Sequence, residues 1–444
     1  MSKVQAGYKS TELGGIPEDW EIVSLADVAD PNKPYALTGG PFGSDLKSEE
    51  YTESGVRIIQ LQNIKEGYFS NKYKIYTSEA KANQLFKCNI FPNDIIIAKM
   101  AEPVARACII PNLHERYLMA SDGIRLAVNE EDYCTKYVMY AINSSYFRQQ
   151  AIDNSTGTTR LRIGLKTLKR LKFLKPSKEE QQKIATILST VDKDIEKTET
   201  IIEQTEKVKK GLMQQLLTKG IGHTKFKRTE IGEIPVEWEV KRLDEIASFI
   251  SNGFVGVASP YYSEEIDAIP YLMSNNVRAN KLDLRKLTRV KKEFNDEFVK
   301  SILQEGDLLT VQSGHIGTTA VVPKEFERAN CHALIITRVS DNGINPYFVS
   351  YFLNSVVGMN LLKKIFVGST ILHINTKDFK KFKVPIPNLI EQQRIVDALN
   401  SIEDKIQNEQ GKLTQLQILK KGLMQSLLTG NIRVKGDEAE VTQV

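Results

Sequence analysis

Two basic stretches of this chain have the composition of a phosphate-binding surface. Residues 158–175 carry seven Lys and Arg side chains and no acid, and residues 363–383 carry six Lys and one His around the single acid Asp378. Such side chains bind DNA phosphates and position a protein without reading sequence. One basic run alone is usually a solvated face, but its recurrence favours DNA. The predicted phosphate contacts are Lys166, Lys169, Arg170, Lys172, Lys377, Lys380 and Lys381.

Reading a DNA sequence requires polar side chains that reach base edges. The candidates are loop residues that differ between the two halves of the chain. In the first half they are Ser44, Gln60, Gln62, Asn63, Lys99, Arg106, Arg160 and Arg162. In the second half they are Asn252, Ser274, Asn275, Asn276, Gln312, Ser313, His315, His373 and Asn375.

No pattern of residues predicts bond-making or bond-breaking chemistry. Residues 30–35 (Asp-Pro-Asn-Lys-Pro-Tyr) resemble a broken form of the Asp/Asn-Pro-Pro-Tyr loop of amino-methyltransferases, with Lys33 separating the prolines and no preceding Gly-rich cofactor loop. Residues 39–44 are Gly-rich but lack the Gly-Lys-Ser/Thr of a phosphate loop, so we expect a turn or a loop that approaches DNA closely. The five His residues have no metal-ligand spacing, and we expect no metal site.

The totals are those of an ordinary globular protein. A chain of 444 residues is too long for one core, and its net charge of +5 permits a nucleic-acid partner without requiring one. The four Cys form no CxxC pair, which argues against a zinc ribbon or a disulfide framework. The absence of an apolar signal core and of a long apolar run predicts a cytoplasmic protein without a membrane span.

The chain repeats itself. Residues 11–22 and 229–240 each contain Gly-x-Ile-Pro-x-x-Trp or its close variant, and Trp20 and Trp238 are the only two Trp residues. Residues 209–218 and 420–429 are identical at nine of ten positions. A protein with two copies of one module suits a target with two halves.

Each module consists of a globular part followed by a long helix. Short apolar runs such as 56–61, 94–98, 124–128, 308–311 and 333–339 predict strands in mixed α/β globular parts. Spacings of four and three then predict a coiled-coil seam on each helix. The seam residues are Ile184, Leu188, Val191, Ile195, Ile202, Leu212, Leu216, Ile395, Leu399, Ile402, Ile406, Leu413, Leu416, Leu423 and Leu427.

The expected fold is mixed α+β, with two globular domains separated by a long antiparallel two-helix coiled coil in a pseudo-two-fold repeat. The alternative is that each helix packs only on its own domain. The expected boundaries are 1–176 and 220–387 for the globular domains, 177–219 and 388–430 for the helices, and 431–444 for a flexible tail.

The chain resembles the specificity subunits of Type I restriction-modification systems over essentially its whole length. The resemblance rests on Gly-Ile-Pro-x-x-Trp at 15–20 and its copy at 233–238, on Glu-Gln-Gln-Lys/Arg-Ile at 180–184 and 391–395, and on Lys-Lys-Gly-Leu-Met-Gln-x-Leu-Leu-Thr closing each helix. No single motif is specific, but their duplicated order is. The modest net charge is the one departure from the family's pattern.

The resemblance implies a non-catalytic DNA reader. Each globular part would be a target-recognition domain for one half of a bipartite, asymmetric DNA site. The helices would set the spacer and dock two modification subunits, which carry S-adenosylmethionine, and restriction subunits with ATP and Mg²⁺ would join them. The chain itself would bind no cofactor. The alternatives are a stand-alone DNA methyltransferase or nuclease, and a coiled-coil scaffold without a DNA role.

Overall fold

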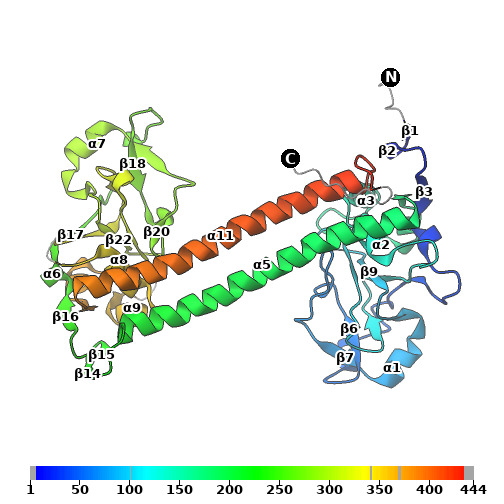
Figure 1. The fold of residues 1–444 in the computed structure, drawn as a ribbon, viewed down its shortest axis with the longest axis horizontal. Coiled ribbons are helices and arrows are strands. Elements are labelled where there is room, and N and C mark those ends of the chain that lie inside the picture. Colours follow the sequence, from blue (N-terminus) through cyan, green and yellow to red (C-terminus); the bar gives the residue numbers. More distant parts are fainter. Residues whose placement is uncertain (1–6, 101, 341–342, 369–371, 435–444) are drawn as a thin grey trace. The chain divides into compact units, whose positions relative to one another are not determined.

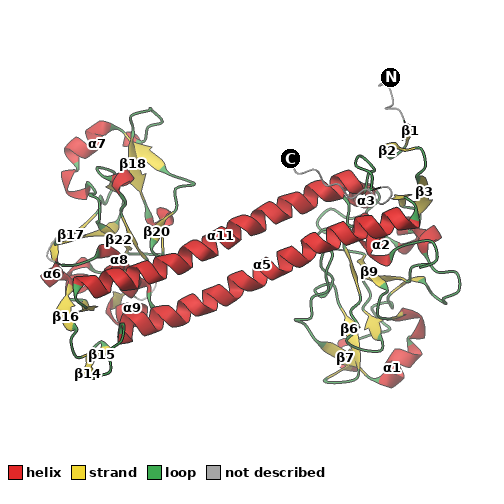
Figure 2. Ribbon diagram, viewed as in Figure 1, coloured by secondary structure: helices red, strands yellow, loops and turns green. Residues whose placement is uncertain are grey.

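A computed structural model describes residues 7–100, 102–340, 343–368 and 372–434, and it divides into two compact units. Unit 1 contains the chain up to Thr198 and from Lys412 onward, and unit 2 contains Glu199–Gly411. Figures 1 and 2 show that each unit combines a mixed α/β globular part with segments of two long helices, α5 and α11. The α/β composition predicted from the sequence is confirmed.

Unit 1 contains two small antiparallel pairs and two larger sheets. The pairs are β1 (Tyr8–Thr11) with β2 (Gly14–Pro17), and β3 (Glu21–Ser24) with β13 (Lys172–Lys175). One sheet has the order β10 (Ala107–Ile109), β9 (Ile95–Ala98), β12 (Gly123–Leu126), β4 (Leu37–Gly39). The other has the order β5 (Tyr51–Thr52), β7 (Ile75–Thr77), β6 (Val56–Ile59), β11 (Tyr117–Met119), β8 (Asn89–Ile90).

The helices of unit 1 other than α5 and α11 are short. They are α1 (Glu79–Gln84), α2 (Thr135–Ile142), α3 (Ser145–Asp153) and α4 (Leu165–Leu168), with the 3-10 helices η1 (Leu25–Val28), η2 (Ser48–Glu50) and η3 (Phe86–Cys88).

Unit 2 repeats this plan. The pairs are β14 (Phe226–Thr229) with β15 (Gly232–Pro235), and β16 (Glu239–Arg242) with β28 (Lys383–Ile386). Its four-stranded sheet has the order β17 (Ala247–Asn252), β25 (Leu334–Val339), β22 (Leu308–Val311), β23 (Thr319–Val321). The three-stranded sheet is β21 (Thr288–Val290), β18 (Ile269–Leu272), β24 (Asn330–Cys331), and two further pairs are β19 (Val277–Arg278) with β20 (Lys281–Leu282) and β26 (Phe366–Val367) with β27 (His373–Ile374).

The short helices of unit 2 are α6 (Leu243–Ile246), α7 (Lys292–Glu297), α8 (Pro346–Asn354), α9 (Val356–Leu362) and α10 (Thr376–Lys380). Its 3-10 helices are η4 (Ser259–Tyr261), η5 (Ser274–Asn276), η6 (Val299–Ser301), η7 (Lys324–Phe326) and η8 (Lys363–Ile365).

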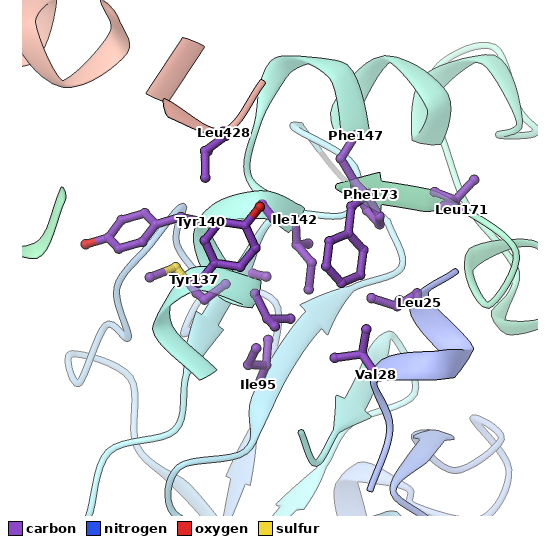
Figure 3. Close-up of a cluster of buried hydrophobic side chains, with 14 of the residues drawn as sticks. Leu25, Val28, Ile95, Tyr137, Tyr140, Ile142, Phe147, Leu171, Phe173 and Leu428 are labelled. Atoms are coloured by element: carbon purple, nitrogen blue, oxygen red, sulfur yellow. The ribbon is translucent and has the colours of Figure 1, made fainter. Parts of the chain in front are cut away.

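The main core of unit 1 joins the sheet to the helices. Tyr137 and Ile142 of α2 and Phe147 of α3 pack with Ile95 of β9 and with Phe173 of β13, and all five are buried (Figure 3). Ile184 and Leu188 of α5 and Leu427 of α11 belong to the same cluster. The matching cluster of unit 2 includes Phe348 and Phe352 of α8, Leu216 of α5, and Ile395 and Leu399 of α11. Each globular part is thus packed against both long helices.

Helices α5 (Lys178–Lys219) and α11 (Leu389–Leu427) are antiparallel, as predicted. In unit 1, Asp192 near the start of α5 is paired with Lys420 near the end of α11 at 2.6 Å. In unit 2, Lys209 near the end of α5 is paired with Glu403 near the start of α11 at 2.7 Å. The fifteen predicted seam residues are all buried or half-buried, as a heptad seam requires.

The Glu-Gln-Gln sequence at the start of each long helix has a structural explanation. The Ser177 hydroxyl and the Asn388 side chain each accept a hydrogen bond from the backbone N–H three residues later, which caps the helix. The buried amide oxygens of Gln181 and Gln392 accept hydrogen bonds from the backbone N–H groups of Cys134 and Asn345, at the starts of α2 and α8. The second residue of each motif therefore ties its helix to its own globular part.

The first residue of each motif holds the Trp of the repeat. The Trp20 indole N–H donates to Glu180 Oε2 at 3.0 Å, and the Trp238 indole N–H donates to Glu391 Oε2 at 3.0 Å. All four side chains are buried. The two Trp residues, 218 positions apart in the sequence, thus occupy the same place in the two units.

A second side chain bound to each carboxylate follows the end of the other long helix. In unit 1 the Arg433 guanidinium donates to both Glu180 oxygens, at 2.8 and 2.9 Å, and forms two further bonds to Asp19. In unit 2 the His223 ring lies between Glu391 (2.9 Å) and Glu237 (3.1 Å). Arg433 and Val434, at the start of the predicted tail, are therefore hydrogen-bonded to unit 1, and residues 435–444 lie outside the described ones.

We predict that Glu180→Gln destabilises unit 1 at neutral pH and much less in acid. Burial alone would raise the pKa of Glu180, but hydrogen bonds from Arg433, the Val434 N–H and Trp20 outweigh it and lower the pKa below 4.5. The stabilisation is therefore complete above that pH and is lost as the pH falls through the lower folded-state pKa. The expected loss at neutral pH is about 1.5–3 kcal/mol.

The measurement is urea unfolding of the full chain in a Trp238→Phe background, so that Trp20 fluorescence reports unit 1. The control is Glu391→Gln in the same background, which alters unit 2. A difference between wild type and Glu180→Gln that stays constant from pH 7 to pH 3 would contradict the prediction.

Candidate nucleic-acid interface

Two predicted base-reading residues of unit 1, Lys99 and Arg162, lie at the end of edge strand β4. Lys99 follows β9, and its ammonium donates to the Ser121 carbonyl at 2.9 Å. The exposed Arg162 is bridged through its backbone to Met100, the residue after Lys99, and its guanidinium is paired with Asp122 at 2.8 Å. We call Gly39, Lys99, Ser121, Asp122 and Arg162 the edge cluster of unit 1.

The two cations of this cluster, Lys99 and Arg162, differ in how accessible they are to solvent. Burial, followed by repulsion from Arg162, lowers the pKa of Lys99, while Asp122 opposes that effect. The Lys99 ammonium lies so close to Gly39 that an added Cβ there would be 2.9 Å from it. Of the two cations Lys99 and Arg162, Arg162 is the one whose charged group is open to solvent, since its side chain is about half exposed.

Unit 2 builds the same arrangement from other side chains. Gln312 follows β22 as Lys99 follows β9, and His373 is bridged to Ser313 as Arg162 is bridged to Met100. Asn252, the last residue of edge strand β17, accepts hydrogen bonds at Oδ1 from Gln312 and from the Thr376 hydroxyl. The edge cluster of unit 2 is Asn252, Gln312, Ser313, His373 and Thr376, without a charged Lys or Arg.

A second group of candidates has an internal role instead. Asn63 is buried, accepts from the Gln60 N–H and donates to the carbonyls of Ser70 and Tyr73. Asn276 is likewise buried, accepts from the Met273 N–H and donates to the carbonyls of Asp283 and Lys286. Each side chain closes its own loop, so contact of Asn63 or Asn276 with a base would require these hydrogen bonds to break.

The Arg106 side chain is also held by backbone groups of its own unit. Its guanidinium is largely buried and donates to the carbonyls of Ile64, Leu61 and Glu102. His315 is exposed, and its Nε2 lies 3.1 Å from the Val277 carbonyl. Arg106 thus connects the turn after β9 to the loop that follows β6, and His315 connects the turn after β22 to the start of β19.

The remaining candidates lie at or near the surface of their loops. Gln62 donates to the Gln60 side chain at 2.9 Å, and Asn375 caps α10 by accepting from the Lys377 N–H. Arg160 lies next to the edge cluster on the turn that Gly157 (φ +97°) opens, a conformation that favours glycine. The exposed or half-exposed residues of this set are Ser44, Gln60, Gln62, Arg160, Ser274, Asn275 and Asn375.

The basic stretches follow the edge clusters directly. Lys166 on α4 and Lys377 on α10 are exposed in the two units, as are Arg170 and Lys381 after these helices. Lys169 and Lys380 are half-buried. Lys172 is already paired with Glu12 of the N-terminal hairpin, and Lys383 of unit 2 with Glu230 at 2.6 Å. Lys172 is therefore a poorer phosphate ligand than the sequence indicates.

Comparison with protein families fits this duplicated site. The model of the type I restriction modification DNA specificity domain matches residues 17–207 and again residues 235–417. The chain belongs to this family. Both copies of the domain contain one edge cluster and one basic stretch.

Members of the family resemble this chain along its whole length. It is 27% identical over 441 residues to the putative type I restriction enzyme MjaX specificity subunit of Methanocaldococcus jannaschii, covering 97% of this chain and 98% of the relative. It is 22% identical over 425 residues to the EcoBI specificity subunit of Escherichia coli, covering 91% and 85%.

Solved structures agree with the fold. A type I restriction-modification S subunit from M. genitalium has a TM-score of 0.55 at 17% identity, with 92% of this chain and 96% of that chain covered. A chain from a study of complex assembly and conformational transition of the type I R-M system has a TM-score of 0.57 at 16% identity, covering 94% and 99%.

Among the residues that the structure describes, no group of three or more His, Cys, Asp or Glu could hold a metal ion. No helix in the same part of the chain is long and apolar enough to cross a membrane. Asp122 and Thr376 are not predictable from the sequence, because only the fold brings them to Arg162 and Asn252. The basic stretch contains Thr376, but nothing in its composition singles that residue out.

We predict that Asn63→Ala and Asn276→Ala are stability variants of this specificity-domain protein and leave its DNA preference unchanged. Each leaves two backbone carbonyls and one N–H without a partner, at a cost of about 1–3 kcal/mol. Chemical unfolding measures the destabilisation, and sequencing of methylated host DNA reports the preference. A changed methylation sequence in a variant that folds would contradict the prediction and indicate that the residue contacts a base. The matched comparison is Gln62→Ala, which opens no loop.

Proposed function

We propose that this chain is the DNA-reading specificity subunit of a type I restriction-modification complex, with each unit reading one half of a bipartite, asymmetric site. The observation that carries the proposal is the pair of edge clusters. The backbone bridges Met100–Arg162 and Ser313–His373 are alike, while the side chains at the cluster are Lys99 and Arg162 in unit 1 but Gln312 and His373 in unit 2.

The chemistry of the two clusters favours different bases. Arg and Lys donate to the O6 and N7 acceptors of guanine, whereas Asn and Gln pair with the donor and acceptor of adenine. A unit with Lys99 and Arg162 is therefore suited to a G·C-containing half-site. Gln312 and Asn252 are suited to an A·T-containing half-site. The exposed Lys and Arg residues beside each cluster supply phosphate contacts that position the unit.

The helices α5 and α11 are the proposed frame for the rest of the complex. Each is continuous from one unit into the other, so their length would set the spacer between half-sites. They would also dock two modification subunits, with restriction subunits joining. In this proposal S-adenosylmethionine, ATP and Mg²⁺ are bound by those partners, and this chain is the non-catalytic reader.

The local geometry of residues 30–35 supports a non-catalytic role. The Asp30 carboxylate accepts the N–H of Asn32 and is paired with Lys33 at 3.4 Å, as in a tight turn. The Lys33 insertion thus lies in a small surface turn. A stand-alone methyltransferase would instead bind S-adenosylmethionine as the purified chain, and such binding would contradict the proposal.

Exchange of the first globular part tests whether each unit reads its own half-site independently. Replacing residues 1–176 by the corresponding part of another family member should change one half of the methylated sequence and leave the other half and the spacer intact. Sequencing of methylated DNA from a host that carries the partner subunits measures this. An unchanged motif would favour a scaffold without a DNA role, and changes in both halves would contradict independent reading.

Salt dependence tests the phosphate contacts. Lys166→Ala combined with Arg170→Ala should weaken binding of the assembled complex to all DNA sequences alike. It should flatten the plot of log affinity against log salt by ~0.9 for each DNA phosphate that is no longer neutralised by a basic side chain. Lys172→Ala is the matched control, because Glu12 already holds that ammonium. An equal slope for the double variant and wild type would remove these residues from the interface.

A further inference from the structure

An exposed aromatic side chain stands beside the edge cluster of unit 1. Phe42 is 82% exposed, although its neighbours Pro41 and Leu46 are buried. The Asp45 N–H donates to the Phe42 carbonyl at 2.9 Å and closes the turn. Exposing a Phe ring to water is unfavourable. Here buried residues anchor the turn on both sides of Phe42, and the ring at its tip remains exposed.

The loop is also anchored at its start. Gly40 donates its N–H to the Gly123 carbonyl at 2.8 Å, and a Cβ at Gly40 would be 1.9 Å from the Ala120 carbonyl oxygen. Only glycine permits this close approach of the two backbones. The sequence 39–44 is therefore Gly-rich because it passes tightly against the segment carrying the cluster residues Ser121 and Asp122.

Unit 2 repeats the anchor and the exposed tip. Gly253 donates its N–H to the Leu334 carbonyl at 2.8 Å, and a Cβ there would be 2.7 Å from the Cys331 carbonyl oxygen. Phe254 packs on Phe294 and Phe298, and Ala258 is buried. Between these anchors Val255 is 70% exposed, and Val257, next to the buried Ala258, is 75% exposed.

Phe42 and Val255 stand in the same place, two residues after the anchoring glycine and three after the last residue of the edge strand. Both edge strands end at an edge cluster. Two units that differ in their polar side chains thus both present an apolar side chain at this position. The recurrence indicates that the exposed apolar tip has a use in each unit.

We infer that Phe42 and Val255 make apolar contacts with the bases of their own half-sites, beside the polar contacts of the edge clusters. This inference rests on the proposed function. DNA offers apolar surface at the thymine methyl group in the major groove and on the faces of the bases. The larger Phe42 ring and the smaller Val255 side chain would then add a difference in size to the difference in polar chemistry.

The test uses the full complex with its modification subunits and DNA carrying the methylated sequence found for wild type. Phe42→Ser should weaken binding of that DNA about tenfold, as expected for the loss of one base contact. It should reduce the base preference only in the half-site that the exchange of residues 1–176 assigns to unit 1. Val255→Ser should relax only the other half-site. The control is Leu113→Ser, which removes a 55% exposed side chain elsewhere in unit 1.

Two DNA substitutions identify the part of the base that is contacted. Uracil in place of thymine removes the methyl group, and 2-aminopurine becomes fluorescent when it is unstacked. A loss of wild-type affinity with uracil that Phe42→Ser does not show supports a methyl contact. A fluorescence rise with wild type that Phe42→Ser abolishes supports contact with a base face. Weaker binding with neither response overturns base contact.

The inference is also overturned if both tip variants keep wild-type affinity and sequence preference, or if Leu113→Ser weakens binding equally. Those results leave the proposed function intact, because exchange of residues 1–176 would still change one half-site. If that exchange leaves the motif unchanged, the proposed function fails irrespective of the tip variants.

Discussion

The structure depends on a buried glutamate at the start of each long helix. Glu180 and Glu391 are removed from water, so each carboxylate needs partners that offset the cost of burial. The partners come from two parts of the chain: the Trp of the repeat, and the segment after the opposite helix, which contributes both a side chain and a backbone N–H. Satisfying one buried charge therefore fixes a hairpin, a helix start and a helix end at the same point.

This constraint explains which parts of the sequence are repeated. The Trp motif, the Glu-Gln-Gln motif and the helix-closing motif look unrelated along the chain, but in each unit they meet around one carboxylate and one core. Glycine completes the arrangement, since Gly220 and Gly430 pass close to Trp238 and Trp20 with positive φ. The side chain contributed by the segment after the opposite helix differs between the units, Arg433 in one and His223 in the other. In both units the buried carboxylate still has hydrogen-bond partners.

The sequence was sufficient to predict this frame because the frame depends on local and periodic features. Seam residues recur at helical spacing, the strands at 95–98 and 308–311 are continuous apolar runs, and the motifs occur in the same order twice. The interface was less predictable, because a polar residue type does not reveal its partner. Asn63, Asn276 and Arg106 have the right chemistry for bases, yet backbone carbonyls brought near by folding occupy their donors. Phe42 shows the opposite case, since an apolar residue in a sequence is usually taken for core.

In both units, the same backbone contacts position the edge cluster, while the side chains of the cluster differ. The edge clusters are held by backbone contacts: the bridges to Arg162 and His373, the N–H groups of Ile163 and Ile374 donating to the carbonyls of Lys99 and Gln312, and the glycine approaches at the edge strands. None of these contacts uses the side chains that distinguish the clusters. A substitution of Lys99 by Gln, or of Arg162 by His, thus removes no backbone contact that positions the cluster. Different surface chemistry can be presented by one unchanged scaffold, which is the physical requirement for a protein whose two copies of one domain address different targets.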